Sequence, residues 1–141
     1  HTRTRRQRQM CIRDSKNVLI MDYVGSATSP SPKLRDVSIE DPVPVYEDLL
    51  RFLAISWQKA KLVHGDFSPY NILWHDERAC VIDVGQAVVD SHPKAQEFLV
   101  RDVTRLVEWG QKNGMDVDLA GAMYEVLNMD LTDVEQVEML D

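Results

Sequence analysis

The residues best suited to chemistry lie in one stretch, residues 62–88. Asp66 is followed five positions later by Asn71, then by two short apolar runs separated by a polar turn, and Asp83 ends the second run. Phosphoryl transfer from a magnesium nucleotide needs a carboxylate that orients the acceptor hydroxyl, and hard oxygen ligands for the metal. We therefore interpret Asp66, Asn71 and Asp83 as candidate catalytic residues, with Asn71 and Asp83 as the metal ligands. The spacing alone is weak support, because Asp and Asn also form turns.

The residues around these positions resemble the RIO family of atypical serine/threonine protein kinases, nearest to its type-one-like branch. The likeness is carried by VHGDFSPYNIL at 63–73, VIDVGQAV at 81–88 and HPKAQEFLVRDV at 92–103, and it extends over roughly residues 17–114. Kinases of the aminoglycoside or choline type share the HGDxxxxN pattern. They normally lack Ser-x-Tyr in the loop and Gly-Gln-Ala-Val after the aspartate, so a small-molecule kinase is the alternative.

The resemblance implies an α+β fold, namely the C-terminal lobe of a protein kinase, mainly helical with a small β-hairpin at the metal site. It places a glycine-rich phosphate loop, a lysine and its partnering glutamate upstream, in an N-terminal lobe largely missing from this chain. We therefore expect ATP and Mg²⁺ to serve the full-length parent as cofactors, and the chain itself to have no useful catalytic rate. The resemblance further implies serine phosphorylation or ATP hydrolysis linked to maturation of the small ribosomal subunit.

Further site residues follow from the same resemblance. In the hinge, the adenine would meet the backbone of two residues beside a gatekeeper methionine. Apolar side chains beside the metal ligands would form the floor under the adenine, and a loop serine would approach the phosphates. The resulting nucleotide-binding residues are Met21, Asp22, Val24, Ser68, Leu73 and Ile82.

Three residues are expected to support the loop rather than react. The ring of His64 should pack under the loop, Tyr70 should stabilise the loop structure, and Asp102, on a later helix, should bind the loop backbone. Only eight residues separate Asp83 from His92. This connection leaves no room for a long peptide-docking segment, so a slow ATPase or a self-phosphorylating enzyme stays open, with Asp83 itself as a possible phosphoryl acceptor.

Composition limits the function classes. A chain of 141 residues with 44% hydrophobic residues is long enough for one domain with a core. It has neither an apolar run long enough to span a bilayer nor a signal-peptide pattern, so we expect a cytoplasmic protein without membrane contact. The formal charge of −7 argues against direct DNA binding. Cys11 and Cys80 lack metal-ligand spacing, and no disulfide is expected.

The first fifteen residues differ from the rest of the chain. They hold five of the 16 basic residues but one of the 23 acidic residues. Back-translated, residues 5–15 can be written as a nucleotide sequence that resembles a sequencing-library adapter. We therefore expect residues 1–15 to be a non-native tail and exclude them from fold reasoning. A basic disordered arm is the alternative.

The remaining chain divides into three parts. Residues 16–24 are expected to form the last N-lobe strand and the hinge, residues 25–44 a linker rich in Ser and Pro, and residues 45–141 the C-terminal lobe. Apolar periodicity predicts helices over 45–61, 93–112 and 116–128, the second capped by Ser91 and the third burying Leu119, Met123, Val126 and Leu127.

A capping-box pattern, TDVE at 132–135, predicts one more helix running to Leu140. Residues 116–141 contain eight acidic and no basic residues. The plain interpretation is a solvated face. A third hypothesis is an inactive protein-binding module in which the acidic helices bind a basic partner. The expected partners are thus ATP and either a pre-ribosomal small-subunit particle or a basic protein.

Overall fold

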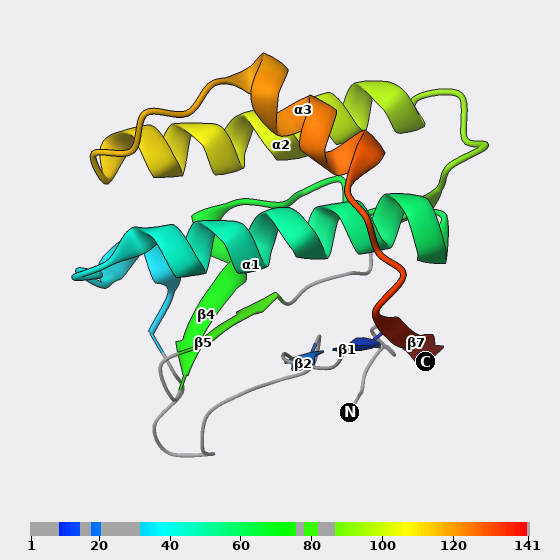
Figure 1. Ribbon diagram of the computed structural model, residues 1–141, viewed down its shortest axis with the longest axis horizontal. Coiled ribbons are helices and arrows are strands. Elements are labelled where there is room, and N and C mark those ends of the chain that lie inside the picture. Colours follow the sequence, from blue (N-terminus) through cyan, green and yellow to red (C-terminus); the bar gives the residue numbers. More distant parts are fainter. Residues whose placement is uncertain (1–8, 15–17, 21–31, 76–77, 82–86, 141) are drawn as a thin grey trace, which may run out of the picture.

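The computed structural model describes residues 9–14, 18–20, 32–75, 78–81 and 87–140. Three α-helices dominate this part: α1 (Pro42–Ile55), α2 (Ala95–Lys112) and α3 (Leu119–Asn128). Helix α1 packs against both other helices, and Figure 1 shows it between them and the small sheets. The mixed, mainly helical architecture expected from the sequence is confirmed.

Short antiparallel strand pairs complete the described fold. Strand β3 (Leu62–Val63) pairs with β6 (Val88–Val89). The predicted hairpin is β4 (Ile72–His75) with β5 (Arg78–Val81), in the register Ile72 to Val81. A further sheet has the order β2-β1-β7, formed by Val18–Ile20, Gln9–Asp14 and Val134–Leu140. Because β1 lies within residues 1–15, the non-native origin of that stretch stays a prediction.

Helix α1 begins earlier than the apolar periodicity predicts. Asp41 is its N-cap, and a side-chain oxygen accepts a hydrogen bond from the backbone N–H of Val43 at 3.3 Å. Pro42 stands at the first helical position, where a missing N–H costs nothing. The helix therefore starts inside the stretch expected to be linker. A 3₁₀ turn, η1 (Leu34–Asp36), precedes it and buries Leu34.

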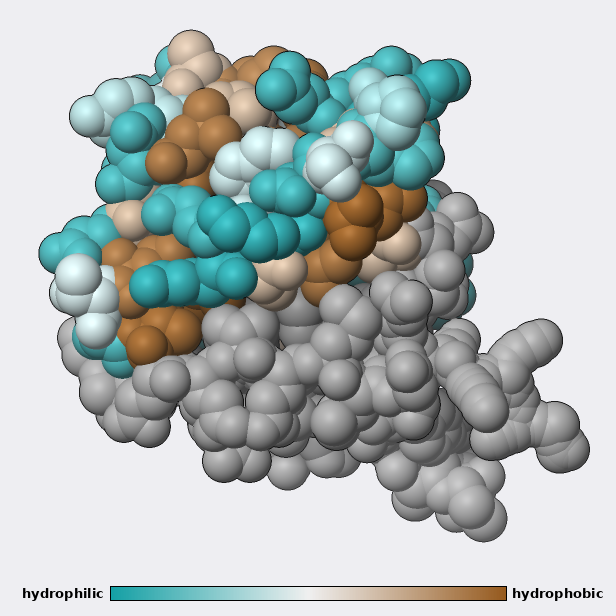
Figure 2. Space-filling view, turned by 90° about the vertical axis from the view of Figure 1, so that its right-hand side faces the viewer, coloured by the Kyte–Doolittle hydropathy of each residue, from teal (hydrophilic) through white to brown (hydrophobic). Residues whose placement is uncertain are grey.

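One hydrophobic core joins these elements. It takes most of its side chains from α1 and α2, with smaller contributions from β3 and the hairpin. Phe52 of α1 and Phe67, which follows β3, stack with ring centroids 5.9 Å apart. Burying aromatic rings of this size contributes strongly to stability. Figure 2 shows one face of the molecule, where hydrophilic residues dominate the helical part and hydrophobic residues gather in separate patches.

The start of α2 corrects the predicted Ser91 cap. The helix begins at Ala95, and its N-cap residue, Lys94, makes no side-chain capping bond. The backbone N–H of Lys94 instead donates to Nδ1 of His92 at 3.0 Å, and the His92 ring stacks on Phe98. The residues expected to form the first turn of α2 therefore form a separate turn before the helix begins. The predicted end is confirmed, with Asn113 as C-cap and Gly114 at φ +86°.

The buried face of α3 also differs from the prediction. Val126 is buried as expected, but Ala122 takes the second central position, Met123 is half-buried, and Leu119 and Leu127 are exposed. Asp118 caps this helix by accepting the Gly121 N–H at 2.8 Å. This helix of ten residues contacts both α1 and α2, and it buries Ala122 and Val126.

The predicted last helix is wrong, because residues 134–140 form strand β7. The expected cap residue is used in a turn: the Thr132 N–H donates to Asp130 Oδ1 at 3.1 Å, and the Val134 N–H donates to the Leu131 carbonyl at 3.1 Å. β7 then pairs antiparallel with β1. Two valines in this short segment favour a strand, since β-branched side chains lose rotamer freedom in helices.

A buried hydroxyl lies in the π-helical turn η2 (Ser56–Ala60), which continues α1. Ser56 is 3% exposed, and its hydroxyl has no hydrogen-bond partner among the described residues. Burying an unpaired hydroxyl costs free energy. We expect Ser56→Ala to raise the free energy of unfolding by roughly 0.5–1 kcal/mol, measured by urea denaturation. A fall of that size would show that the hydroxyl has a partner after all.

Candidate functional site

The loop between β3 and the hairpin, residues 64–71, carries Asp66 and is called the Asp66 loop below. It begins with His64, which is 3% exposed, and passes through Gly65 at φ +88°, a conformation that favours glycine. The His64 Nδ1 accepts a hydrogen bond from the Asp66 N–H at 3.1 Å. The loop ends in the 3₁₀ turn η3 (Pro69–Asn71), where the Asn71 N–H donates to the Ser68 carbonyl at 2.8 Å.

Asp102 on α2 holds this loop from beneath. Its Oδ2 accepts a hydrogen bond from the Gly65 N–H at 2.8 Å, and its Oδ1 accepts one from the Phe67 N–H at 3.1 Å. Asp102 is 1% exposed. Both carboxylate oxygens thus satisfy backbone donors on either side of Asp66, and the backbone of Asp66 is fixed relative to α2.

Two arginines of α2 also reach the loop, and the sequence reasoning missed both. Arg101 Nη2 donates to the Gly65 carbonyl, and its guanidinium lies 4.8 Å from the centre of the Phe98 ring. Arg105 Nη1 lies 3.8 Å from Asp66 Oδ1, with about two-fifths of each side chain exposed. Such an exposed pair is worth little stability. The available signal was the helical spacing, which puts residues near Asp102 on the side of α2 that faces the loop.

Asn71 and Asp66 are directly linked. Asn71 Nδ2 donates to the Asp66 carbonyl at 2.8 Å and to Asp66 Oδ2 at 3.0 Å. Both amide hydrogens are therefore used, which leaves the amide oxygen for another partner such as a cation. The structure thus brings Asp66, Asn71, His64 and Asp102 together in one hydrogen-bonded group.

Of the other predicted site residues, two have described side chains: Ser68, whose carbonyl accepts the Asn71 N–H, and Leu73, two positions beyond Asn71. Ser68 and Leu73 are buried, Ser68 in the loop and Leu73 in β4. Within the described ranges, no three His, Cys, Asp or Glu side chains gather closely enough to hold a metal ion. The predictions for Met21, Asp22, Val24, Ile82 and Asp83, and for the side chain of Tyr70, fall outside the described part of the chain.

Burial dominates the electrostatics of Asp102. Desolvation raises the pKa of its carboxyl above the ordinary value of 3.8, while the two backbone donors, His64 and Arg101 act in the opposite direction. Because the folded protein binds the proton more tightly than the unfolded chain, this group's contribution to stability is fully present below pH 3.8. It is lost as the pH rises through the raised pKa.

Asp102→Asn tests this anchor. An asparagine has one acceptor oxygen, so one of the two loop N–H groups loses its partner and faces an amide NH₂. We expect the free energy of unfolding to fall by about 1–3 kcal/mol, measured by urea denaturation. The wild type's advantage over the variant should shrink as the pH rises from about 4, because only the wild type must ionise a buried carboxyl.

The matched control is Glu108→Gln, the same chemical change at an exposed position of α2. It should change the free energy of unfolding by less than about 0.5 kcal/mol. An Asp102→Asn variant as stable as this control at every pH would contradict the anchoring role.

The sequence is similar to those of known proteins. A family model described as the RIO domain matches residues 10–122. The RIO-type serine/threonine-protein kinase Rio1 of Haloferax volcanii is 38% identical over 115 residues, which are 82% of this chain and 39% of that protein. Its namesake from Thermoplasma acidophilum is 37% identical over 103 residues, 73% of this chain and 53% of that protein.

A solved structure shows the same fold. The crystal structure of the Rio2 kinase-ADP/Mg²⁺-phosphoaspartate complex from Chaetomium thermophilum matches with a TM-score of 0.55 and 26% identity, over 82% of this chain and 38% of that chain. The chain thus spans 38 to 53% of the length of these relatives. Their names favour the protein-kinase prediction over the small-molecule kinase alternative. With a family model matched over most of its residues, the chain belongs to the RIO family of serine/threonine-protein kinases.

Proposed function

We propose that this chain is the catalytic-lobe part of an ATP- and Mg²⁺-dependent RIO-type phosphotransferase. The observation that carries the proposal is the hydrogen-bonded group of Asp66, Asn71 and Asp102, found in a chain of the RIO family. A phosphotransferase needs a fixed carboxylate next to a hard oxygen ligand. The hydrogen bond between Asn71 and Asp66 supports such a pair, and family membership supports the class of reaction.

Asp66 is the proposed base. In this role its carboxylate accepts a hydrogen bond from the acceptor hydroxyl and takes the proton as the oxygen attacks the terminal phosphorus. Asp102 and Asn71 position Asp66, one through the loop backbone and the other through Oδ2. Arg105 lies close enough to keep the carboxylate turned toward α2 until a substrate approaches.

Asn71 and Asp83 are the proposed magnesium ligands. The donor set fits the metal, because the Asn71 amide hydrogens both bind Asp66 and the amide oxygen is left for a cation. When bound, Mg²⁺ would supply charge neutralisation on the phosphate oxygens. The remaining nucleotide contacts proposed from the family resemblance are Met21, Asp22, Val24, Ser68, Leu73 and Ile82.

The acceptor is either a serine hydroxyl of a protein or Asp83. The Chaetomium thermophilum Rio2 structure is a complex with ADP, Mg²⁺ and phosphoaspartate. By analogy, an Asp83 carboxylate oxygen would form a bond to the terminal phosphorus of ATP while the bond to the ADP oxygen breaks. Water would then release phosphate and restore the carboxylate. This second reaction makes the enzyme an ATPase, and both reactions use the same site.

The proposal also covers the partner and the cellular location of the parent protein. By family resemblance the parent protein acts on maturation of the small ribosomal subunit, and its partner is a pre-ribosomal particle or a basic protein. None of the helices in the described part of the chain is long and apolar enough to cross a bilayer. Because ATP is an intracellular substrate, we place the activity in the cytoplasm.

Turnover by a longer form of the protein tests the function. A form that includes the upstream phosphate loop should hydrolyse ATP or phosphorylate protein, whereas the present chain should show no useful rate. In the longer form, Asp66→Asn should lower turnover by roughly 100-fold or more, since a general base contributes about that factor. ADP release measured with and without Mg²⁺ gives the rates, and Glu97→Gln on the exposed side of α2 is the matched control.

A phosphoenzyme assay separates the two acceptors. With ATP labelled at the terminal phosphate, an acyl phosphate on Asp83 should appear as protein-bound label that hydroxylamine removes, and Asp83→Asn should abolish it. Label that resists hydroxylamine indicates a serine ester. A longer form that neither binds Mg²⁺-nucleotide nor acquires label would refute the phosphotransferase proposal and leave a protein-binding module.

A further inference from the structure

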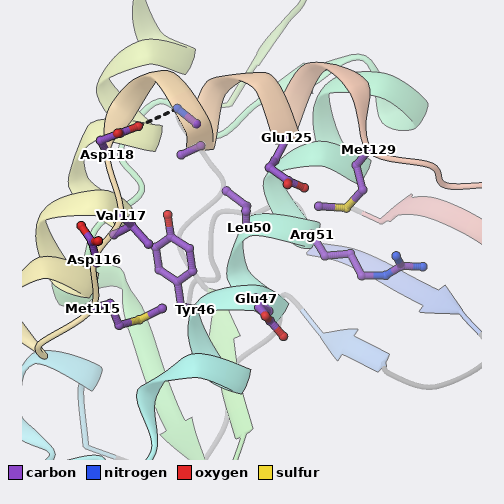
Figure 3. Close-up of a pocket in the computed structure, with 12 residues that line it drawn as sticks. Tyr46, Glu47, Leu50, Arg51, Met115, Asp116, Val117, Asp118, Glu125 and Met129 are labelled. Carbon is purple, nitrogen blue, oxygen red and sulfur yellow. Dashed lines mark hydrogen bonds between the residues drawn. The ribbon is translucent and has the colours of Figure 1, made fainter.

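A pocket of about 630 Å³ opens between α1, residues 115–118 and α3. Figure 3 shows Tyr46 and Leu50 of α1 facing Val117 and Glu125 across this space. The pocket is called the acidic pocket below, because four of the residues that line it are Glu47, Asp116, Asp118 and Glu125. None of its described lining residues belongs to the Asp66 loop, so the pocket is a different site. Its volume is in the range of ligand-binding pockets.

Tyr46 is a buried polar side chain that lines the pocket. The residue is 5% exposed, and its hydroxyl has no hydrogen-bond partner among the described residues. Its ring lies against α2 at Gly110, where an added Cβ would come within 3.0 Å of two ring carbons. The missing side chain at Gly110 therefore lets the ring lie deep between the helices. The hydroxyl itself is not fully buried, because Ser56 Oγ is the only fully buried side-chain polar atom without a partner among the described residues. A group that enters the pocket can therefore reach the Tyr46 hydroxyl.

The charges around this hydroxyl are mostly negative. Among the described residues that line the pocket, Arg51 is the one basic residue, and its guanidinium is bound to Asp133 at 2.7 Å. Burial raises the pKa of the Tyr46 phenol, and the negative charges of Asp118 and Glu125 raise it further. The pocket therefore favours a positive charge and disfavours an anion such as a nucleic-acid phosphate.

The rest of the lining is apolar and adaptable. Leu50 and Ala122 lie on the facing sides of α1 and α3, and Met115 and Met129 stand at the two ends in Figure 3. Methionine side chains adjust to ligands of different shape. A ligand that fits must therefore combine an apolar stem with a cationic end. Arginine meets this description, and its guanidinium is hydrated weakly enough to enter a partly apolar site.

We propose that the acidic pocket binds an arginine side chain from a basic segment of a protein partner. The guanidinium would donate to the Tyr46 hydroxyl and to the carboxylates of Asp118 and Glu125, while its methylene stem lies on Leu50 and the methionines. The argument for this occupant is charge complementarity together with the buried Tyr46 side chain, whose hydroxyl lines the pocket and has no hydrogen-bond partner among the described residues. Binding needs no nucleotide, so it is independent of phosphoryl transfer.

The probe is a short fluorescein-labelled peptide with repeated Arg-Leu-Ala units, titrated with the 141-residue chain and followed by fluorescence anisotropy. Saturable binding that weakens with added salt is expected. The same peptide with citrulline in place of arginine keeps the shape and loses the charge. We expect it to bind at least about tenfold more weakly, because a charged hydrogen-bonded group is lost.

Three variants map the binding to the pocket. Asp118→Asn keeps the capping oxygen that accepts the Gly121 N–H, and it removes the charge. Combined with Glu125→Gln it should weaken binding by about tenfold or more, and Tyr46→Phe by a smaller factor. The control Glu97→Gln removes one charge from an exposed position that does not line the pocket, and should stay within about twofold. Urea denaturation of each variant shows that it is folded.

The proposal fails if the citrulline peptide binds as tightly as the arginine peptide, or if the pocket variants bind like Glu97→Gln. It also fails if spermidine binds with the same response to the variants while the peptide does not, since the occupant would then be a free amine. Sedimentation of the chain alone tests whether it self-associates. Self-association that Tyr46→Phe abolishes would mean that a second copy fills the pocket.

Discussion

The described site depends on two hydrogen bonds from the backbone of the Asp66 loop to the Asp102 carboxylate. The loop backbone has neither a helix nor a strand to satisfy its N–H groups between β3 and η3. One buried carboxylate supplies acceptors for two of them, at Gly65 and Phe67. Because Asp102 lies in the middle of α2, the packing of that helix on α1 determines where the loop lies.

A second anchor makes this arrangement rigid. Phe67, directly after Asp66, is buried and stacks on Phe52 of α1. The side chains on the two sides of Asp66 are thus fixed, His64 by burial and Phe67 by the core, while about two-fifths of the Asp66 side chain itself is exposed. The carboxylate is thus held by its neighbours and stays partly accessible to solvent, as its proposed role as a base requires. A raised Asp102 pKa is the cost of placing that acceptor in the core.

Sequence patterns predicted the parts of this structure that depend on local periodicity. The three helices, the hairpin and the end of α2 at Asn113 and Gly114 follow from apolar spacing and from glycine conformation. Patterns failed at β7, which is a strand that pairs with β1. They also failed at the start of α2, where His92 accepts the Lys94 N–H and stacks on Phe98, so that the helix begins after Ser91 and His92. The spacing singled out Asp66 and Asn71, which the structure joins by hydrogen bonds, while their catalytic roles stay a prediction. Arg101 and Arg105 were missed, since only the three-dimensional approach of α2 gives them a role.

The net charge of −7 conceals a division of charge between the two sites. Arginines of α2 approach the Asp66 loop, the proposed phosphotransfer site, whereas carboxylates line the pocket between α1 and α3. Screening limits exposed charges to about 8–10 Å at physiological salt, so each site presents its own sign to what approaches it. A single net charge therefore describes neither site. The proposed phosphotransfer site and the proposed arginine pocket lie on different elements, the first on the Asp66 loop and the second between α1 and α3.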